Sequence, residues 1–456
     1  MGQLSSALTR IEHDLLGEVE VPADALYGAQ TTRALENFPA AGDRSIGSYP
    51  CLVEALLRVK QASAAANRDA GLLDAARADA IIAAARAILD EPRFDQFPIH
   101  RFHGGGGTSA NMNANEVLAN VAEELLGGTR GRYRLVHPND HVNLNQSTND
   151  IYPTACHVAV VGAWPEAECA IARLADAFRA KGTALGGLRR IARTCLQDAV
   201  DTTFDDLFQG YAGFLRRALA RVSHAVDALH AVNLGGTIVG RRSDVPEQYF
   251  EMVIPALRTA TGDDRYVRAE SLFDAAQNPD DLVAVSAALD LLARGLVKIA
   301  KDLRLLASGP EAGLQEIRLP AVQPGSSIMP GKINPVIPEF TIQLALQITG
   351  NHAACQAALD HGELDLNVWE SLIVFNMLDS MALLATAASA LDAKCVAGLE
   401  ADVERNARHT DTIIPLLTRL TASHSYSVIT DLVTQANGDP TALRALLERL
   451  QAGEKS

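Results

Sequence analysis

Aromatic residues are scarce in this sequence, and long uninterrupted apolar runs are absent from it. Only 5% of the 456 residues are Phe, Trp or Tyr although 48% are hydrophobic, so Ala, Leu, Val and Ile must build most of the core. Such side chains suit closely packed helices, and we expect a mainly α fold with a large core. No run approaches the roughly 18 apolar residues that span a membrane, and the N-terminus shows no secretory signal pattern. We therefore expect a soluble, cytoplasmic protein without a membrane partner.

Basic residues are outnumbered, and the cysteines have no paired spacing. The 55 acidic and 40 basic residues give a net charge of -15. This charge argues against nucleic acid and anionic membranes as partners, because like charges repel. The six cysteines form no CxxC motif, which indicates reduced thiols in a cytoplasmic protein. Four histidines, at 100, 103, 137 and 141, lack acidic partners at a ligand-like spacing, so we expect no metal.

Small, polar and helix-breaking residues gather in the segment GSSIMPGKINP, Gly325–Pro335, between two long apolar helical patterns. Two prolines and two glycines in eleven residues exclude a regular helix and predict a loop. Lys332 and Asn334 together can bind a substrate carboxylate by a charge-assisted contact and an amide hydrogen bond. Ser326 or Ser327 can then face the adjacent carbon as a base, if positive charge and backbone N–H groups stabilise the alkoxide. The alternative interpretation is a surface turn with a solvated lysine.

Two further polar segments precede helical patterns. In HGGGGTS, His103–Ser109, the glycines lead into a helix start that carries Thr108 and Asn111, and free N–H groups there suit a carboxylate. The segment lacks the lysine of a phosphate loop. In NQSTND, Asn145–Asp150, five neutral hydrogen-bonding side chains stand where a helix should begin. Capping of the two helices is the alternative use of these side chains.

The long pattern after Asn278-Pro279-Asp280-Asp281 predicts a bundle helix that ends before Ser308-Gly309-Pro310. Its seam residues are spaced alternately three and four apart: Leu282, Val285, Leu289, Leu292, Leu296, Ile299, Leu303 and Leu306. Further apolar residues lie outside the seam, at Val283, Leu291, Val297 and Leu305. More than one face of this helix must therefore be covered.

Several segments together resemble the aspartase/fumarase superfamily, whose members eliminate an amine or water from a succinyl skeleton. The Gly325 loop resembles the signature loop of the family. The other matching segments cover most of the chain: IEHDLLGEVEVPADALYGAQTTRALENF at 11–38, GGTSANMNANEVLAN at 106–120, HPNDHVNLNQSTNDIYPTA at 137–155 and KDLRLLASGPEAGL at 301–314. The resemblance implies three domains: a mostly helical domain at 1–145, a central helical bundle at 146–398 and a small helical domain at 399–456. It also implies a homotetramer with active sites built from loops of three subunits.

The resemblance also implies roles for the polar residues. Ser326 is expected to remove the C3 proton, which requires no metal and no organic cofactor. The expected carboxylate ligands are Thr194, Lys332 and Asn334 at one end of the substrate and Thr108, Ser147 and Thr148 at the other. Further positions that match the substrate site are Asn111, Asn149, Cys195 and Met329. The expected supporting residues are Ser327, Glu339 and Arg241.

Two departures from the family pattern bear on the leaving group. RTCLQDAV places Cys195 where hydratases of the family carry histidine and ammonia-lyases carry histidine or glutamine, and a thiol replaces neither as a strong hydrogen-bonding partner. The flanking LQDAV is closer to the ammonia-lyase form. In GRRSDVP, Arg241 and Arg242 stand where most members have GTGLN; they either face solvent or a subunit contact, or they accommodate an additional anionic group of the substrate.

These observations favour a carbon–nitrogen lyase that eliminates ammonia, or a related nitrogen group, from aspartate or an aspartate-like substrate to give fumarate. The proton leaves first, and the adjacent carboxylate holds the charge as an enediolate. The alternatives are fumarate hydratase, a lyase for a substituted or unusual aspartate analogue, and a non-catalytic protein that has kept the fold.

Overall fold

The computed structural model describes residues 8–39 and 42–452, and the chain divides into two compact units. The first unit comprises Met1–Ala167, Ala220–Leu291 and Gln347–Ala382, and the second comprises Glu168–Leu219, Leu292–Leu346 and Leu383–Ser456. The division into three domains stays a prediction.

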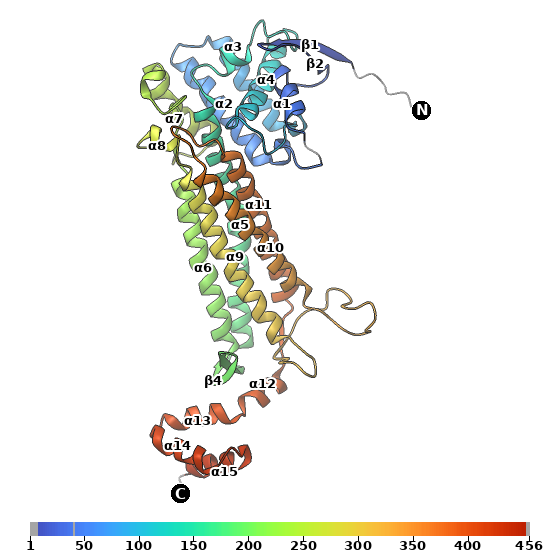
Figure 1. The fold of residues 1–456 in the computed structure, drawn as a ribbon, viewed down its shortest axis with the longest axis vertical. Helices are drawn as coiled ribbons and strands as arrows, with labels where there is room; N and C mark the ends of the chain where they lie inside the picture. Colours follow the sequence, from blue (N-terminus) through green and yellow to red (C-terminus); the bar gives the residue numbers. More distant parts are fainter. Residues whose placement is uncertain (1–7, 40–41, 453–456) are drawn as a thin grey trace. The chain divides into compact units, whose positions relative to one another are not determined.

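Helices make up most of the described chain (Figure 1). They are α1 (Ala29–Asn37), α2 (Pro50–Asp69), α3 (Ala75–Asp90), α4 (Thr108–Leu125), α5 (Thr148–Leu185), α6 (Phe204–Ala228), α7 (Glu247–Thr261), α8 (Leu272–Ala275), α9 (Asp280–Leu306), α10 (Val336–Asp360), α11 (Glu370–Leu391), α12 (Val403–Thr410), α13 (Ile413–Thr421), α14 (Tyr426–Gln435) and α15 (Pro440–Gln451). The strands pair two by two: β1 (Thr9–Asp14) with β2 (Gly17–Pro22), β3 (Arg189–Thr194) with β4 (Gln197–Thr203), β5 (Ala231–Val232) with β6 (Val267–Arg268), and β7 (Ile317–Arg318) with β8 (Glu400–Ala401). All pairs are antiparallel except β5 with β6.

In the first unit, α2 packs against α3 and α7, and α3 packs against α4. Pro50 occupies the first turn of α2, where its missing N–H costs no hydrogen bond. The Ala-rich region from 50 to 90 is helical and ends at Asp90, because Pro92 disfavours a helical conformation of the preceding residue, Glu91. The structure adds a break at 70–74, so this region forms two helices rather than one.

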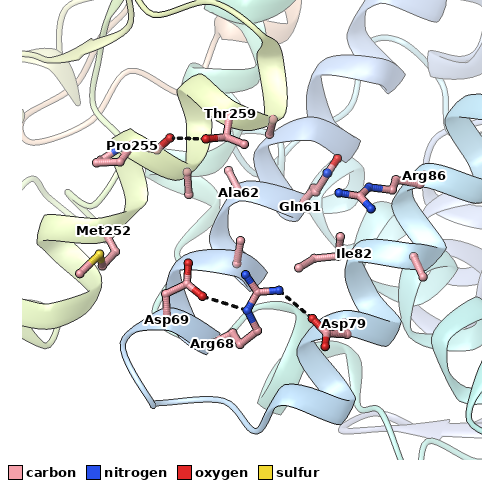
Figure 2. A pocket seen from close by; sticks show the side chains of 14 residues that line it. Gln61, Ala62, Arg68, Asp69, Asp79, Ile82, Arg86, Met252, Pro255 and Thr259 are labelled. Atoms are coloured by element: carbon pink, nitrogen blue, oxygen red, sulfur yellow. Dashed lines mark hydrogen bonds and ion pairs between the residues drawn. The ribbon is translucent and has the colours of Figure 1, made fainter.

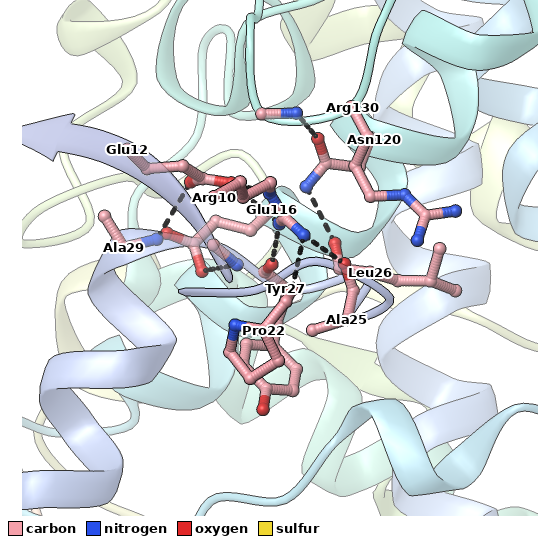
Figure 3. Close-up of polar contacts among 12 residues, drawn as sticks. Arg10, Glu12, Pro22, Ala25, Leu26, Tyr27, Ala29, Glu116, Asn120 and Arg130 are labelled. Atoms are coloured by element: carbon pink, nitrogen blue, oxygen red, sulfur yellow. Dashed lines mark hydrogen bonds and ion pairs between the residues drawn. The ribbon is translucent and has the colours of Figure 1, made fainter. Parts of the chain in front are cut away.

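Two buried glutamates connect the β1–β2 hairpin, α1 and α4 (Figure 3). Glu116 of α4 accepts hydrogen bonds from the backbone N–H groups of Gly28, Gln30 and Thr31 and from the Thr31 hydroxyl. These donors belong to the free N–H groups at the start of α1, so Glu116 caps that helix from another element. Glu12 accepts from the Ala29 N–H.

Two arginines of the N-terminal region form ion pairs. Arg10 binds Glu12 at 2.8 Å and donates to the Pro22, Ala25 and Tyr27 carbonyls, which fixes the turn after β2. Arg33 forms a two-point contact with Asp14 at 2.7 and 2.9 Å. Both arginines therefore have structural partners close by.

The predicted bundle seam is confirmed in α9. Every seam residue is at most 5% exposed, and the helix spans Asp280–Leu306 between the two predicted breaks. Outside the seam, Leu291 is 57% exposed and Leu305 is 44% exposed. The single chain therefore leaves part of the apolar surface of α9 uncovered.

The second unit contains a β3–β4 hairpin, within the range 146–398 where the family resemblance implies a helical bundle. The hairpin is anchored at Glu316, which is fully buried and lies 2.5 Å from Arg193. The Glu316 carboxylate also accepts a hydrogen bond from the His409 ring at 2.9 Å. Arg190 lies 3.8 Å from the same carboxylate. The two-residue turn of the hairpin, Cys195 and Leu196, has φ of 52° and 61°, the left-handed pair of a tight hairpin turn.

The last helices form a small cluster of their own in the second unit, as expected for the short helical tail. Leu416, Leu420, Ile429, Leu432 and Leu447 make its core, and each is at most 7% exposed. Within the described residues, one helical stretch, Glu370–Val396, is long and apolar enough by composition to cross a membrane. Because 67% of its most apolar window is buried inside the fold, it matches the core helix of a helical bundle.

Candidate functional site

The N-terminus of α4 follows three consecutive glycines in left-handed conformation. Gly105, Gly106 and Gly107 have φ of 82°, 59° and 87°. A Cβ on Gly107 would lie 2.4 Å from the Tyr152 ring, so only glycine allows this close approach. The turn places Thr108 in the first turn of α4, where its hydroxyl donates to the Gly105 carbonyl at 2.7 Å.

Amide side chains of α4 converge on Asn143 in the first unit. The Asn143 Oδ1 atom accepts from Asn111 Nδ2 at 3.2 Å, from Asn115 Nδ2 at 3.1 Å and from the Lys60 ammonium at 2.9 Å. Asn111 Nδ2 also donates to the Thr148 hydroxyl oxygen at 3.2 Å. The structure thus brings two predicted substrate-site residues, Asn111 and Thr148, into direct contact.

The start of α5 is held by a reciprocal pair of contacts. The Ser147 hydroxyl accepts from the Asn149 N–H at 3.2 Å, and Asp150 Oδ1 accepts from the Ser147 N–H at 2.9 Å. This is the arrangement of a capping box. Asp150 is fully buried, and burial raises its pKa to about 6, although hydrogen bonds from the Ser147 and Gly235 N–H groups oppose that shift. Ser147, Thr148 and Asn149 therefore form one ordered polar segment at a helix N-terminus.

Lys60 is the cation nearest this segment in the contacts described. It is fully buried on α2 and donates to Asn143 Oδ1 and Gln146 Oε1, each at 2.9 Å. Burial lowers its pKa to about 7, and the negative charge of Asp150 opposes that shift. Sequence reasoning missed this residue. The available signal was a lysine on the apolar face of an Ala-rich helix, four residues after Leu56.

The Gly325–Pro335 segment is a loop in the second unit, as predicted, and it is largely exposed in the single chain. The Gly325 N–H donates to the Lys332 carbonyl at 2.9 Å, and Asn334 Nδ2 donates to the Gly325 carbonyl at 2.6 Å. The Ser326 hydroxyl oxygen accepts from the Met329 N–H at 3.0 Å and from the Ile328 N–H at 3.3 Å. The loop therefore brings Ser326, Lys332 and Asn334 together, with backbone donors directed at the serine oxygen.

The other predicted residues of the loop differ in exposure. Ser327 and Lys332 are exposed, and Met329 is 49% exposed. Glu339, on the first turn of α10, pairs with Arg304 at 3.2 Å. Its negative charge is thus directed at a neighbouring guanidinium rather than free to act alone.

Thr194 and Cys195 lie at the exposed tip of the β3–β4 hairpin in the same unit. Arg241 and Arg242 belong to the first unit, and both side chains are exposed. Arg241 pairs with Asp244 at 2.7 Å, whereas Arg242 contacts Glu247 and Glu251. The carboxylates balance both guanidinium groups locally.

A cavity of about 880 Å³ in the first unit is lined by the β1–β2 turn, α1 and the start of α4. Thr108 lines it, together with Arg33 and His137. The guanidinium of Arg33 is occupied by Asp14. Thr108 is thus the one predicted substrate ligand on the wall of this cavity.

A second cavity, of about 390 Å³, lies between α2, α3 and α7 (Figure 2). Arg68 on its wall binds Asp69 at 2.9 Å and Asp79 at 2.7 Å. The cavity contains none of the predicted site residues. The guanidinium of Arg68 is paired with these two carboxylates, so Arg68 is not a free cation for an anionic substrate.

Comparison with known proteins places these segments in a family. A family model described as Lyase matches residues 17–350. Aspartate ammonia-lyase of a Bacillus species is 40% identical over 96% of this chain and 92% of that protein. Fumarate hydratase class II of Ralstonia nicotianae is 42% identical over 96% of this chain and 94% of that protein. The chain belongs to the aspartase/fumarase superfamily.

Solved structures agree with the assignment to the aspartase/fumarase superfamily. The native fumarate lyase:delta crystallin of Brucella melitensis has a TM-score of 0.88 and 44% identity, and the match covers 95% of this chain and 98% of that one. Class II fumarase of Schistosoma mansoni has a TM-score of 0.92 and 32% identity, covering 98% and 96%. The predicted mainly α, fumarase-like fold is confirmed, and this superfamily member is an enzyme of the lyase type. Some relatives are named aspartate ammonia-lyase and others fumarate hydratase, so similarity alone does not decide whether ammonia or water is the leaving group.

Proposed function

We propose that the chain is an aspartase-type carbon–nitrogen lyase that releases ammonia, or a related nitrogen group, from aspartate or an aspartate-like substrate. The observation that supports this most is the closed loop around Ser326. Two backbone N–H groups point at the Ser326 oxygen, at 3.0 and 3.3 Å, so hydrogen bonds favour its charged form. Lys332 on the same loop adds positive charge. Ser326 is thereby suited to remove the C3 proton as a general base.

The carboxylate beside C3 gains charge as the proton leaves. Donors directed at that group stabilise the transition state more than the substrate. We assign this role to Ser147 and Thr148, with Thr108, Asn111 and Asn149 nearby in the site, because they stand at two helix N-termini. Thr194, Lys332 and Asn334 hold the other carboxylate. Met329 and Cys195 complete the contacts, and Ser327, Glu339 and Arg241 have supporting roles.

The assembly we propose is a homotetramer in which loops of different subunits complete each active site. The exposed apolar side chains of α9 and α10 support it: Leu291, Leu305, Phe340 and Leu346 are 40% to 58% exposed in the single chain. A helix that is apolar on several faces requires a partner on each of them. No metal or organic cofactor takes part in the proposed reaction.

The second candidate is a lyase for a substituted or otherwise unusual aspartate. Cys195 supports it, because a thiol at the tip of the hairpin replaces the stronger hydrogen-bonding side chains of the family at this position. Fumarate hydratase is less favoured for the same reason, and a non-catalytic role does not account for the Ser326 loop.

The experiment is a substrate panel with the purified protein. Aspartate, malate and N-substituted aspartates are each incubated with the enzyme, and fumarate is followed by its ultraviolet absorbance. We expect product from aspartate or an N-substituted aspartate. Product from malate alone would reject the amine substrate, and no product from any of them would reject the proposed reaction.

A pair of serine variants tests the proposed base. Ser326→Ala should lower kcat by about 10³-fold, within the range for loss of a general base. Ser327→Ala is the matched comparison, because the neighbouring hydroxyl is exposed and has only a supporting role, and it should lower kcat much less than Ser326→Ala. Full turnover by Ser326→Ala would eliminate Ser326 as the base.

A further inference from the structure

The buried ammonium of Lys60 has a contact pattern that core packing does not require. Its hydrogen bonds go to two neutral amide oxygens, Asn143 Oδ1 and Gln146 Oε1, rather than to a carboxylate. Burying a cation among neutral acceptors is costly, and an apolar side chain would suit the Ala-rich helix α2 better. Both acceptors belong to the polar segment that leads directly into Ser147 and Thr148.

The contacts around Lys60 form a relay with a fixed direction. An ammonium can only donate, so the group that faces it must be an acceptor, which sets Asn143 with Oδ1 toward Lys60. The Asn143 Nδ2 atom donates to the Gln146 carbonyl at 3.2 Å, which agrees with this orientation. Asn111 must then present Nδ2 to Asn143 Oδ1, and the same nitrogen donates to the Thr148 oxygen.

The relay determines what Thr148 can do. Its oxygen already accepts a hydrogen bond from Asn111, and no acceptor for its own hydrogen is among the contacts described. The hydroxyl hydrogen is therefore available for an acceptor outside the chain. A carboxylate at the N-terminus of α5 is such an acceptor, and the helix end favours its negative charge.

We propose that Lys60 is a positioning residue for carboxylate binding: through Asn143 and Asn111 it orients the Thr148 hydroxyl as a donor to a substrate carboxylate. The inference rests on the proposed function for the nature of the substrate. Lys60 itself does not touch the reacting atoms. It supplies the fixed end of the relay and a positive charge behind the binding segment.

Succinate binding, measured by calorimetry, tests the relay independently of turnover. Lys60→Met keeps the chain length but removes the donor, and we expect succinate affinity to fall about 10-fold or more, as for loss of a charge-assisted hydrogen bond. For the proposed reaction, kcat/KM should fall further. Leu56→Ala is the matched control: it removes a fully buried apolar side chain from the same helix, and the folded fraction should keep wild-type affinity.

A double-mutant cycle with Thr148→Val separates positioning from general destabilisation. If Lys60 acts through Thr148, the double variant should lose no more succinate affinity than the single variant that binds succinate more weakly. The proposal would be overturned if the double variant lost affinity by the product of the two single fold-changes. Wild-type affinity in Lys60→Met would also overturn it. If Lys60→Met does not fold, the same cycle with Lys60→Gln applies, because its polar end fits the amide surroundings. Glutamine keeps a neutral N–H donor but removes the positive charge, so its loss of affinity should be smaller and should again not multiply with that of Thr148→Val.

The two proposals fail in different ways. A wild-type protein that binds succinate but converts neither aspartate nor its N-substituted forms would overturn only the proposed function. A wild-type protein that binds no succinate would overturn the carboxylate role assigned to Lys60 and Thr148.

Discussion

Gly325 determines how closely the two ends of the Ser326 loop approach each other, the end at Gly325 and the end at Lys332–Asn334. A Cβ on Gly325 would lie 2.4 Å from the Lys332 carbonyl oxygen and 2.7 Å from the Asn334 nitrogen, distances that real Cβ atoms do not show. The φ of Gly325 is not in the left-handed region, so space rather than backbone strain is the reason for glycine here. At Gly331, on the same loop, a Cβ would have open space, but the φ of 85° is a left-handed conformation that favours glycine. Backbone strain rather than space is the reason for glycine at that position.

We therefore predict that Gly325→Ala lowers kcat/KM by about 10² while the protein stays folded. The added methyl group must separate the two ends, which displaces Ser326 from its backbone donors, and displacements near 1 Å can cost about this much in rate. Steady-state kinetics and a thermal unfolding scan check the two parts. Gly187→Ala is the control, since that glycine has open space and needs no left-handed φ. Unchanged kinetics in Gly325→Ala would show that the close approach is not needed.

At this scale, the sequence was most informative where composition alone restricts the backbone. The glycines and prolines around Ser326 predict a loop, and the loop is there. Lys60 was missed because its role depends on Asn143 and Gln146, which are more than 80 positions away in the chain. Hydrogen bonds between distant residues leave no periodic pattern in a sequence.

At the scale of elements, the junction of α1 with α4 depends on a carboxyl group away from water. Burial raises the pKa of Glu116 to about 7, although hydrogen bonds from Thr31, Gln30 and Gly28 oppose the shift. Between pH 4.5 and 7 the folded carboxyl group keeps its proton while the unfolded one has lost it. The folded state then binds more protons, so the free energy of unfolding falls as pH rises through this window.

We predict that Glu116→Gln loses less stability at pH 8 than at pH 5. At low pH the wild type gains from its protonated Glu116, and this advantage shrinks by about 3 kcal/mol as pH rises through 7. Urea unfolding of both proteins at fixed chain concentration measures the difference. Glu124→Gln, on the exposed side of α4, is the control and should show no such trend. A difference that grows with pH would contradict the raised pKa of Glu116.

Helix ends were predictable where the chain carries explicit stop signals, and strands were not. Asp280 and Pro310 bracket α9 because a start signal and a Gly-Pro pair stand next to a strict apolar spacing. The β3–β4 hairpin went unpredicted because its turn, Cys195-Leu196, lacks the Asn-Gly or Asp-Gly that marks such turns. Its stability comes from Arg193 and the buried Glu316, 123 positions apart, rather than from local preference.

At the scale of the whole molecule, the relatives show the family, and the exposed apolar surface of α9 supports the proposed association of subunits. Leu291 and Leu305 lie outside the buried seam of α9 and keep 57% and 44% of their surface exposed. The sequence predicts this surface directly, because both residues are apolar and lie outside the regular seam spacing of the helix. It does not predict which subunit covers it, since that depends on the arrangement of complete chains.

We predict that Leu291→Glu combined with Leu305→Glu shifts the protein from the proposed tetramer, four times the 48.5 kDa chain mass, to smaller species. Burying two carboxylates without partners in a helix interface costs several kcal/mol per subunit, and the apolar contacts of the two leucines are lost as well. Both effects weaken the interface. Light scattering on a sizing column measures the mass. Arg449→Glu, an exposed change on α15, serves as the control and should keep the wild-type mass.

Because the proposed active site combines loops of different subunits, lyase activity should fall together with the tetramer fraction. A variant that dissociates yet keeps full activity would show that each chain works alone, and a variant that remains tetrameric would show that these faces of α9 are not the interface.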